Sequence, residues 1–325
     1  MPKQKSSARR WFVRSPFAFA LLSVCLCACH AEDVASEAAR AEKTKLFAYD
    51  AKLPLAAKED PVQDTGAFTT QAIHFASTNG QIIPALLCRP KNVPKPPVLL
   101  YLHGLGMDKQ GTRVLAAIAA SKGFAVLGID AQYHGERKLP GVEILSADLA
   151  RTRQAIIQTV VDNRRALDYI HSRTDLDSDR VGLLGLSMGA ILGSIVAGVD
   201  TRLCSACLVV GGGRWDVILT QSGHPVSQQL RDQGVTAEKA AQVLGDVDPV
   251  NYVGLIAPRP VQMINGKTDE IVPKAATEAL FAAAQMPKQI QWLEGGHVPS
   301  VPLLLKLIAE WAQTVMTAGA QTPQQ

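Results

Sequence analysis

A serine stands between two glycines in residues 185–189, Gly-Leu-Ser-Met-Gly, directly after an apolar run over residues 181–184. A second run of small apolar residues follows over residues 190–199, so the pattern predicts a strand, a sharp turn and a helix. Such a turn holds a serine hydroxyl clear of the backbone in a strained conformation, where a neighbouring base can activate it. Ser187 is therefore a candidate nucleophile, although a Gly-x-Ser-x-Gly pattern by itself also fits an ordinary turn.

The acid and the base that would activate this serine come later in the chain. An apolar segment over residues 259–266 predicts a buried strand, and Asp269 lies just past its end, at the edge where open α/β sheets bind ligands. Of the seven histidines, only His297 lies beyond Asp269, in a loop that two glycines open. We expect His297 to take the proton from Ser187 and to return it to the leaving group, while Asp269 fixes the imidazole tautomer.

Backbone N–H groups that could stabilise an oxyanion come from two places. Residues 97–102 predict a buried strand, which ends in His-Gly-Leu-Gly at 103–106. We expect the N–H of Met188, directly after the serine, to be one donor and the N–H of Leu105 to be the other, with Gly106 as the alternative. His103 itself is interpreted as structural, with its ring bonded to the loop backbone.

These features together resemble the α/β-hydrolase superfamily. The matching motifs are residues 103–106, 128–137, 185–189 and 248–252, with Asp269 and His297. The form is similar to the branch that contains dienelactone hydrolases, acetyl xylan esterases and small carboxylesterases, and it covers roughly residues 70–315. Dienelactone hydrolases use a cysteine nucleophile, so Ser187 argues against that particular activity. The resemblance implies an α/β fold with a mostly parallel, eight-stranded twisted sheet and helices on both faces.

Strand and helix signals alternate from about residue 71 without a Pro/Gly/Ser-rich break, which favours one α/β domain over residues 67–318 and a tail at 319–325. An insert at about 213–257 is expected to form a small cap over the site. The cap residues Trp215, Ile218 and Leu219 could line a substrate pocket or simply pack the cap onto the sheet. The further pocket candidates are Gly106, His134 and His224, and Arg137 is placed either at the rim or in a structural salt bridge.

The N-terminus predicts export. Basic residues precede an apolar run over residues 17–28, as in a signal peptide that ends near residue 29. Arg9-Arg10 resembles a twin-arginine signal, and Leu26-Cys27-Ala28-Cys29 resembles a lipoprotein processing box. Lipidation at Cys29 would tether the protein to a membrane, whereas cleavage after Ala31 would give a free periplasmic or secreted protein. Residues 30–66 are interpreted as a linker or N-terminal extension.

Composition excludes some partners and cofactors. The chain has 33 basic and 29 acidic residues, and loss of residues 1–28 removes five basic and no acidic ones, leaving 28 against 29. The excess of basic over acidic residues therefore belongs to the export signal and gives no reason to expect nucleic-acid binding.

Cys204 and Cys207 form a single C-x-x-C motif. We interpret both as core residues, with a disulfide between them as the alternative, and we expect neither a metal nor a cofactor.

We therefore predict a serine hydrolase that cleaves small carboxylic esters through an acyl-enzyme on Ser187. An exported serine peptidase or a thioesterase would use the same three residues. A noncatalytic binding protein on the same fold is a further alternative, although the intact Ser187, Asp269 and His297 speak against it. The oligomeric state and the natural substrate stay open.

Overall fold

The structure is a computed structural model that describes residues 40–318 of the chain. The predicted signal peptide at 1–29, its Cys29 and the tail at 319–325 lie outside the described residues. The chain separates into two units, Met1–Lys45 and Leu46–Gln325, and of the first the structure describes only a short helical stretch at 40–45. Between residues 40 and 318, no helix is both long enough and apolar enough to cross a membrane.

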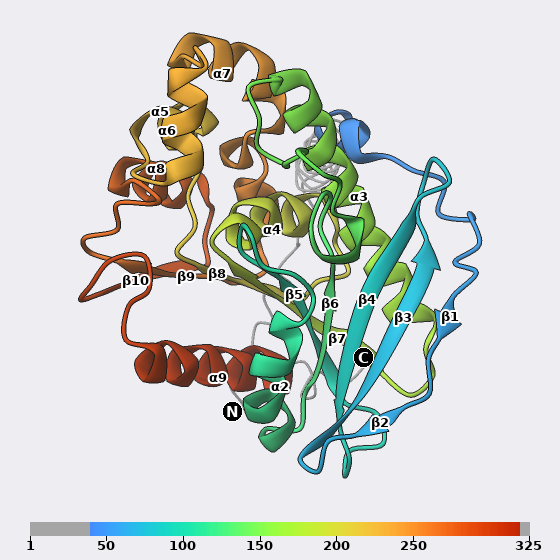
Figure 1. The fold of residues 1–325 in the computed structure, drawn as a ribbon. Coiled ribbons are helices and arrows are strands. Elements are labelled where there is room, and N and C mark those ends of the chain that lie inside the picture. Colours follow the sequence, from blue (N-terminus) through green and yellow to red (C-terminus); the bar gives the residue numbers. More distant parts are fainter. Residues whose placement is uncertain (1–39, 319–325) are drawn as a thin grey trace, which may run out of the picture. The chain divides into compact units, whose positions relative to one another are not determined.

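One sheet organises the second unit (Figure 1). In the part of the chain that the structure describes it has ten strands, in the order β1-β3-β4-β6-β5-β7-β8-β9-β10, with β2 also paired to β3. The strands are β1 Lys58–Glu59, β2 Gln63–Asp64, β3 Phe68–Ala76, β4 Ile82–Pro90, β5 Pro97–Leu102, β6 Ala125–Ile129, β7 Asp177–Leu186, β8 Ser205–Val209, β9 Val261–Gly266 and β10 Lys288–Leu293.

The expected mostly parallel α/β sheet is confirmed, with one difference in strand number. From β6 to β10 every neighbouring pair is parallel, and only the pairings that involve β1 to β4 are antiparallel. The strands from β3 onward are the eight that the resemblance implies. The two extra strands, β1 and β2, have two residues each and pair antiparallel with β3.

Helices cover both faces of the sheet because its central strands are apolar on both sides. In β5, Val98, Leu100 and Leu102 belong to one buried cluster, whereas Leu99 and Tyr101 belong to another. Helices α3, α4 and α8 cover the first face, and α2 and α9 cover the second (Figure 1). The helices are α2 Gly111–Ser121, α3 Leu149–Ser172, α4 Met188–Val199, α5 Trp215–Gln221, α6 Pro225–Asp232, α7 Ala237–Leu244, α8 Lys274–Ala283 and α9 Val301–Ala318, with 3-10 turns η1 Lys45–Phe47, η2 Gly135–Arg137, η3 Gly245–Val247, η4 Pro249–Asn251 and η5 Val253–Ile256.

Residues 30–66 were interpreted as a linker or an N-terminal extension, and the structure favours the extension for residues 46–66. Phe47 is fully buried in the main core, and β1 and β2 extend the sheet edge. The guanidinium of Arg165, buried on α3, donates to the backbone carbonyls of Leu53, Pro54 and Ala76. A polar, alanine-rich segment is thus fixed by hydrogen bonds from a buried arginine, which composition alone does not reveal.

The sheet order also decides where a site can form. The chain runs from β5 outward to β6 and then returns to β7 on the other side of β5, so β5 and β7 lie side by side at a topological switch point. In open α/β sheets, ligands bind in the crevice outside the carboxyl ends of such strands. The loops that follow β5 and β7 are residues 103–110 and the turn at Ser187.

The loop after β5 is held by His103, whose ring is buried. Its Nδ1 lies 2.8 Å from the carbonyl oxygen of Gly104, which can only accept, so Nδ1 carries the proton. Its Nε2 then accepts from the N–H of Ala131, at 3.2 Å, in the loop after β6. Both bonds require a neutral ring, and burial lowers the pKa of His103 to about 4.

We expect His103 to make the protein less stable as pH falls from about 6.5 towards 4. The unfolded chain binds a proton on this imidazole in that window while the folded chain does not, so unfolding is favoured by about 3 kcal/mol at pH 4 relative to pH 7. Urea unfolding of the wild type and of His103→Gln across this range measures the difference, because the variant should lack this part of the slope. An NMR titration of the His103 ring with a midpoint near 6.5 would contradict the argument.

Candidate active site

The turn between β7 and α4 is built on two close backbone approaches. Ser187 has φ 54° and ψ −116°, a conformation that residues with a Cβ rarely adopt. A Cβ on Gly189 would lie 2.0 Å from the carbonyl oxygen of Leu102, and one on Gly185 would lie 2.4 Å from the carbonyl oxygen of Gly189. Side chains are excluded at both positions, which explains the spacing of glycines around the serine.

The structure brings the three predicted residues together. Nε2 of His297 lies 2.8 Å from Oγ of Ser187, and Nδ1 of His297 lies 2.8 Å from Oδ2 of Asp269. Because a carboxylate only accepts, Nδ1 carries the proton and the neutral ring presents a lone pair at Nε2 to the serine hydroxyl. The serine therefore donates to a base that its partner carboxylate orients.

The carboxylate of Asp269 is itself held in place. Its Oδ1 accepts from the backbone N–H groups of Ile271 and Val272, at 2.8 and 3.0 Å, and its side chain is only 3% exposed. The loops after β9 and β10 are joined by a bond from the N–H of Thr268 to the carbonyl of Gly295, at 3.0 Å. These bonds fix the acid and the base relative to each other before any substrate arrives.

Leu105 and Gly106 were the two alternatives for the second oxyanion donor, and the geometry favours the N–H of Leu105. The N–H of Gly106 already donates to Nε2 of His134, at 3.2 Å. Among residues 40–318, no hydrogen bond uses the N–H of Leu105 or of Met188, and both residues line a cavity together with Ser187. Met188 also begins α4, where the helix dipole favours negative charge.

The structure places the pocket candidates His134 and Gly106 outside the lining of the cavity at Ser187. His134 is buried and lies behind the loop after β5, where Nδ1 donates to the carbonyl of Gln132 and Nε2 accepts from Gly106. Neither residue lines the cavity at Ser187. Arg137, for which a rim position was the alternative, forms a buried ion pair with Asp162 at 2.6 Å.

A buried charge pair that sequence reasoning missed supports the same loop. The fully buried carboxylate of Asp130 accepts from the backbone N–H and the Nζ of Lys109, at 2.9 and 2.8 Å, and from the N–H of Glu136. It thereby joins the loop after β5 to the loop after β6. Asp130 follows directly after an apolar strand, and that position was the available signal.

The cavity at Ser187 has a volume of about 240 Å³. Trp215 and Ile218 of α5 line it, as predicted for two of the cap residues, and Leu219 is buried without lining it. No Asp, Glu, Lys or Arg is among its described lining residues. These are Gly104, Leu105, Met107, Leu145, Leu186, Ser187, Met188, Ile191, Val210, Trp215, Ile218, Ser222, His224, Ser227, Ile271, Val272, His297 and Val298.

The cap is fixed above the site by Asp248. Its Oδ2 accepts from the N–H of Trp215, at 2.7 Å, and its Oδ1 accepts from the N–H groups of Arg214 and Val250. The indole N–H of Trp215 donates to the carbonyl of Val247, at 3.1 Å. The Asp-Pro-Val motif noted in the sequence therefore sets the start of α5.

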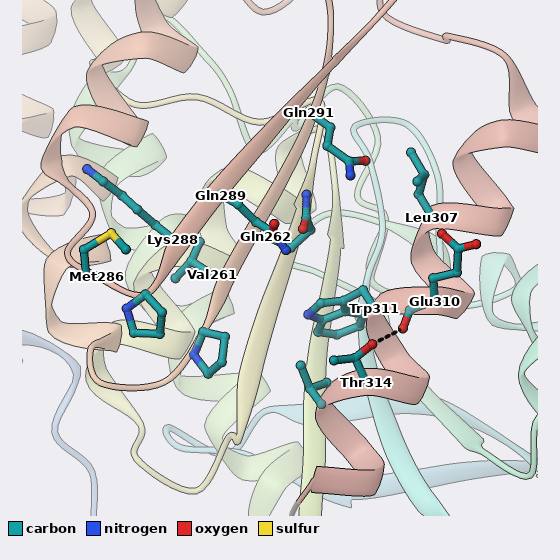
Figure 2. Close-up of a pocket in the computed structure, with 13 residues that line it drawn as sticks. Val261, Gln262, Met286, Lys288, Gln289, Gln291, Leu307, Glu310, Trp311 and Thr314 are labelled. Atoms are coloured by element: carbon teal, nitrogen blue, oxygen red, sulfur yellow. Dashed lines mark hydrogen bonds between the residues drawn. The ribbon is translucent and has the colours of Figure 1, made fainter.

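A larger pocket, of about 500 Å³, lies elsewhere and does not bear on this chemistry (Figure 2). It opens between α9 and the first residues of β9 and β10. These are the amino ends of the strands, whereas Ser187 lies at the carboxyl end of the sheet. Figure 2 shows Trp311 of α9 facing Gln262 of β9, and the hydroxyl of Thr314 donating to the backbone carbonyl of Glu310 within α9. Its lining contains neither a serine nor a histidine.

Cys204 and Cys207 are free thiols in this structure. Cys207 is buried in the core beneath α9, where burial raises the pKa of its thiol, and Cys204 packs against the same core. Their contacts are those of core residues, as interpreted from the apolar run that follows them.

Comparisons with known proteins agree with the fold. A family model described as the prolyl oligopeptidase family matches residues 147–294. YitV of Bacillus subtilis (strain 168), which is named provisionally as an esterase, is 26% identical over 235 residues, or 68% of this chain and 89% of YitV. The acetyl xylan esterase of Paenibacillus sp. R4 superposes with a TM-score of 0.70 at 21% identity, covering 85% of this chain and 93% of that one.

Acetyl xylan esterase 1 of Thermoanaerobacterium sp. JW/SL YS485 gives a TM-score of 0.68 at 18% identity, with 86% of this chain and 93% of that chain covered. The two solved structures therefore share the fold of this chain. The sheet order and the serine turn after β7 agree with these matches, and the chain has the fold of the α/β hydrolases.

Proposed function

We propose that this protein is a serine hydrolase that cleaves carboxylic esters through an acyl-enzyme on Ser187. The observation that carries the proposal is the continuous chain of hydrogen bonds from Ser187 through His297 to Asp269, at the wall of a cavity. The esterase name of YitV and the esterase structures with the same fold agree with this reaction class.

In the first step, Oγ of Ser187 forms a bond to the ester carbonyl carbon while its proton passes to Nε2 of His297. The carbonyl oxygen becomes an oxyanion, which the N–H groups of Leu105 and Met188 would stabilise. The carbon–oxygen bond to the alcohol then breaks, and the alcohol leaves with the proton from Nε2. Water repeats the sequence on the acyl-enzyme, releasing the carboxylic acid and restoring the serine. Removal of one such N–H donor typically costs about 3 kcal/mol of barrier.

A serine peptidase is the second candidate, because the matching family model is that of the prolyl oligopeptidases. The same three residues could also serve a thioesterase. The lining of the cavity favours neutral esters over peptides. Among its described residues there is no carboxylate or basic side chain that would hold the charged terminus of a peptide. A noncatalytic binding protein would have no use for the oriented base.

Ser187→Ala should lower kcat/KM for a p-nitrophenyl ester of a short acid by at least about 10⁴-fold, because the acyl-enzyme can no longer form. A fluorophosphonate probe should label the wild type at Ser187 and leave this variant unlabelled. Ser121→Ala, which changes an exposed serine of α2, is the matched control and should behave as wild type. Hydrolysis by Ser187→Ala at the wild-type rate would refute the mechanism.

Asp269→Asn should lower kcat by roughly 10³- to 10⁴-fold with little change in KM, because an amide no longer fixes the imidazole tautomer that accepts the serine proton. Steady-state kinetics on the same ester, with circular dichroism to check folding, measures the effect. Glu278→Gln removes an exposed carboxylate of α8 and should leave kcat unchanged. An increase in KM with kcat unchanged would mean that Asp269 contributes to substrate binding and not to proton transfer.

We further propose that the protein is exported and that residues 1–29 direct this step. The support is the basic stretch followed by the apolar run and the cysteine at position 29. Intact-mass measurement of the protein recovered from the cell envelope should give a chain that begins at Cys29 with added lipid, or one cut after Ala31 without it. A full-length chain recovered from the cytosol would contradict export.

A further inference from the structure

His224 lies in the wall of the cavity at Ser187, in the turn between α5 and α6. Its Nδ1 accepts a hydrogen bond from the backbone N–H of Val226, at 3.1 Å, in the first turn of α6. An acceptor nitrogen has no proton, so the neutral ring carries its proton on Nε2. The ring is thus a side-chain cap for the helix on one side and a hydrogen-bond donor on the other.

The second nitrogen of this ring, Nε2, carries the donor. Among residues 40–318, no hydrogen bond involves Nε2 of His224. His224 lines the cavity and its Nδ1 is occupied by the first turn of α6, so Nε2 is the nitrogen available to a molecule bound there. Burial, and then the nearby imidazole of His297, lower the pKa of His224, which agrees with the neutral ring that the acceptor Nδ1 requires.

The surroundings of this donor are apolar. Apart from the catalytic candidates, the polar side chains that line the described cavity are His224 and the two serines beside it, Ser222 and Ser227. The Oγ of Ser222 accepts from the backbone N–H of His224, at 3.0 Å, and so helps to set its position. These three polar residues come from one short stretch of the chain, residues 222–227, and most of the other lining side chains are Leu, Ile, Val, Met and Trp.

The turn that carries His224 is attached directly to the loop that carries the acid. The N–H of Gly223 donates to the carbonyl of Glu270, at 2.7 Å, and Glu270 follows Asp269. A Cβ on Gly223 would lie 3.2 Å from that same oxygen, so the two backbones are in close contact. The position of His224 relative to the three catalytic candidates is therefore set by the fold and not by the substrate.

We propose that His224 is a specificity-determining residue, whose Nε2–H donates to an uncharged oxygen on the part of the substrate that occupies the cavity. The substrate class is then a short ester that carries an ether, hydroxyl or carbonyl oxygen near the scissile bond, in preference to a plain alkyl ester. The ring of His224 is half-buried, so a substrate that fills the cavity takes the place of the water that can bind this donor. An ester that lacks the oxygen then leaves the donor without a partner, and it is bound less well in the transition state. The inference rests on the ester hydrolysis proposed above.

Two pairs of nearly isosteric esters test it, each pair differing by an oxygen in place of a methylene group. The first pair, p-nitrophenyl methoxyacetate and p-nitrophenyl butyrate, changes the acyl side. The second pair, 2-methoxyethyl acetate and n-butyl acetate, changes the alcohol side. For each pair the ratio of kcat/KM is compared between variants, so differences in intrinsic reactivity cancel.

The matched variants are His224→Asn and His224→Ala. Asparagine is a favoured helix N-cap whose side-chain oxygen can accept from the N–H of Val226, but it is too short to place a donor where Nε2 lies. Alanine removes both the cap and the donor. Both variants should lower the oxygen-to-methylene ratio by roughly 5- to 30-fold in one of the two pairs, and the pair that responds shows which side of the ester fills the cavity.

A ratio that stays at the wild-type value in both pairs would overturn the role of His224 while leaving ester hydrolysis intact. The same holds if His224→Ala loses activity and His224→Asn behaves as wild type, because only the cap would then matter. Absence of Ser187-dependent hydrolysis of all four esters by the wild type would instead overturn the proposed function, and this inference with it.

Discussion

The contact between Gly189 and the end of β5 is the constraint on which the site depends. A single Cβ at this position would lie 2.0 Å from the carbonyl oxygen of Leu102, so α4 begins as close to β5 as two backbones allow. The approach forces Ser187 into its strained conformation and brings the N–H of Met188 to the same cavity as the loop that carries Leu105. This close contact between α4 and β5 can form only because β5 and β7 are neighbours in the sheet.

The rest of the site is attached to this contact by hydrogen bonds between loops. His103 and Asp130 hold the loop after β5 against the loop after β6. The bond from Thr268 to Gly295 joins the loops of the acid and the base, and the bond from Gly223 to Glu270 joins the cap to the acid loop. Each of these loops thus has a neighbour that limits its movement, which suits a reaction that needs preorganised groups.

The fold class and the order of the proposed catalytic residues could be predicted because they depend on local patterns. Apolar runs marked the buried strands, glycine spacing marked the turn at Ser187, and chain order singled out Asp269 and His297 from the other candidates. His134 was misplaced because the sequence pattern of a histidine after a strand is the same for a ring that faces the cavity and for a ring that faces the loop behind it. Arg165 gave no signal that its guanidinium would donate to the backbone carbonyls of Leu53, Pro54 and Ala76.

The sequence by itself determined which residues can do chemistry here and in which order they occur, because strand and turn preferences act over a few neighbouring residues. Only the tertiary structure decided which donors are still available. The N–H of Gly106 is taken by His134, whereas the N–H of Leu105 and the Nε2 of His224 have no partner within residues 40–318. Hydrogen bonds between segments far apart in the chain settle that question, and their geometry exists only once the chain has folded.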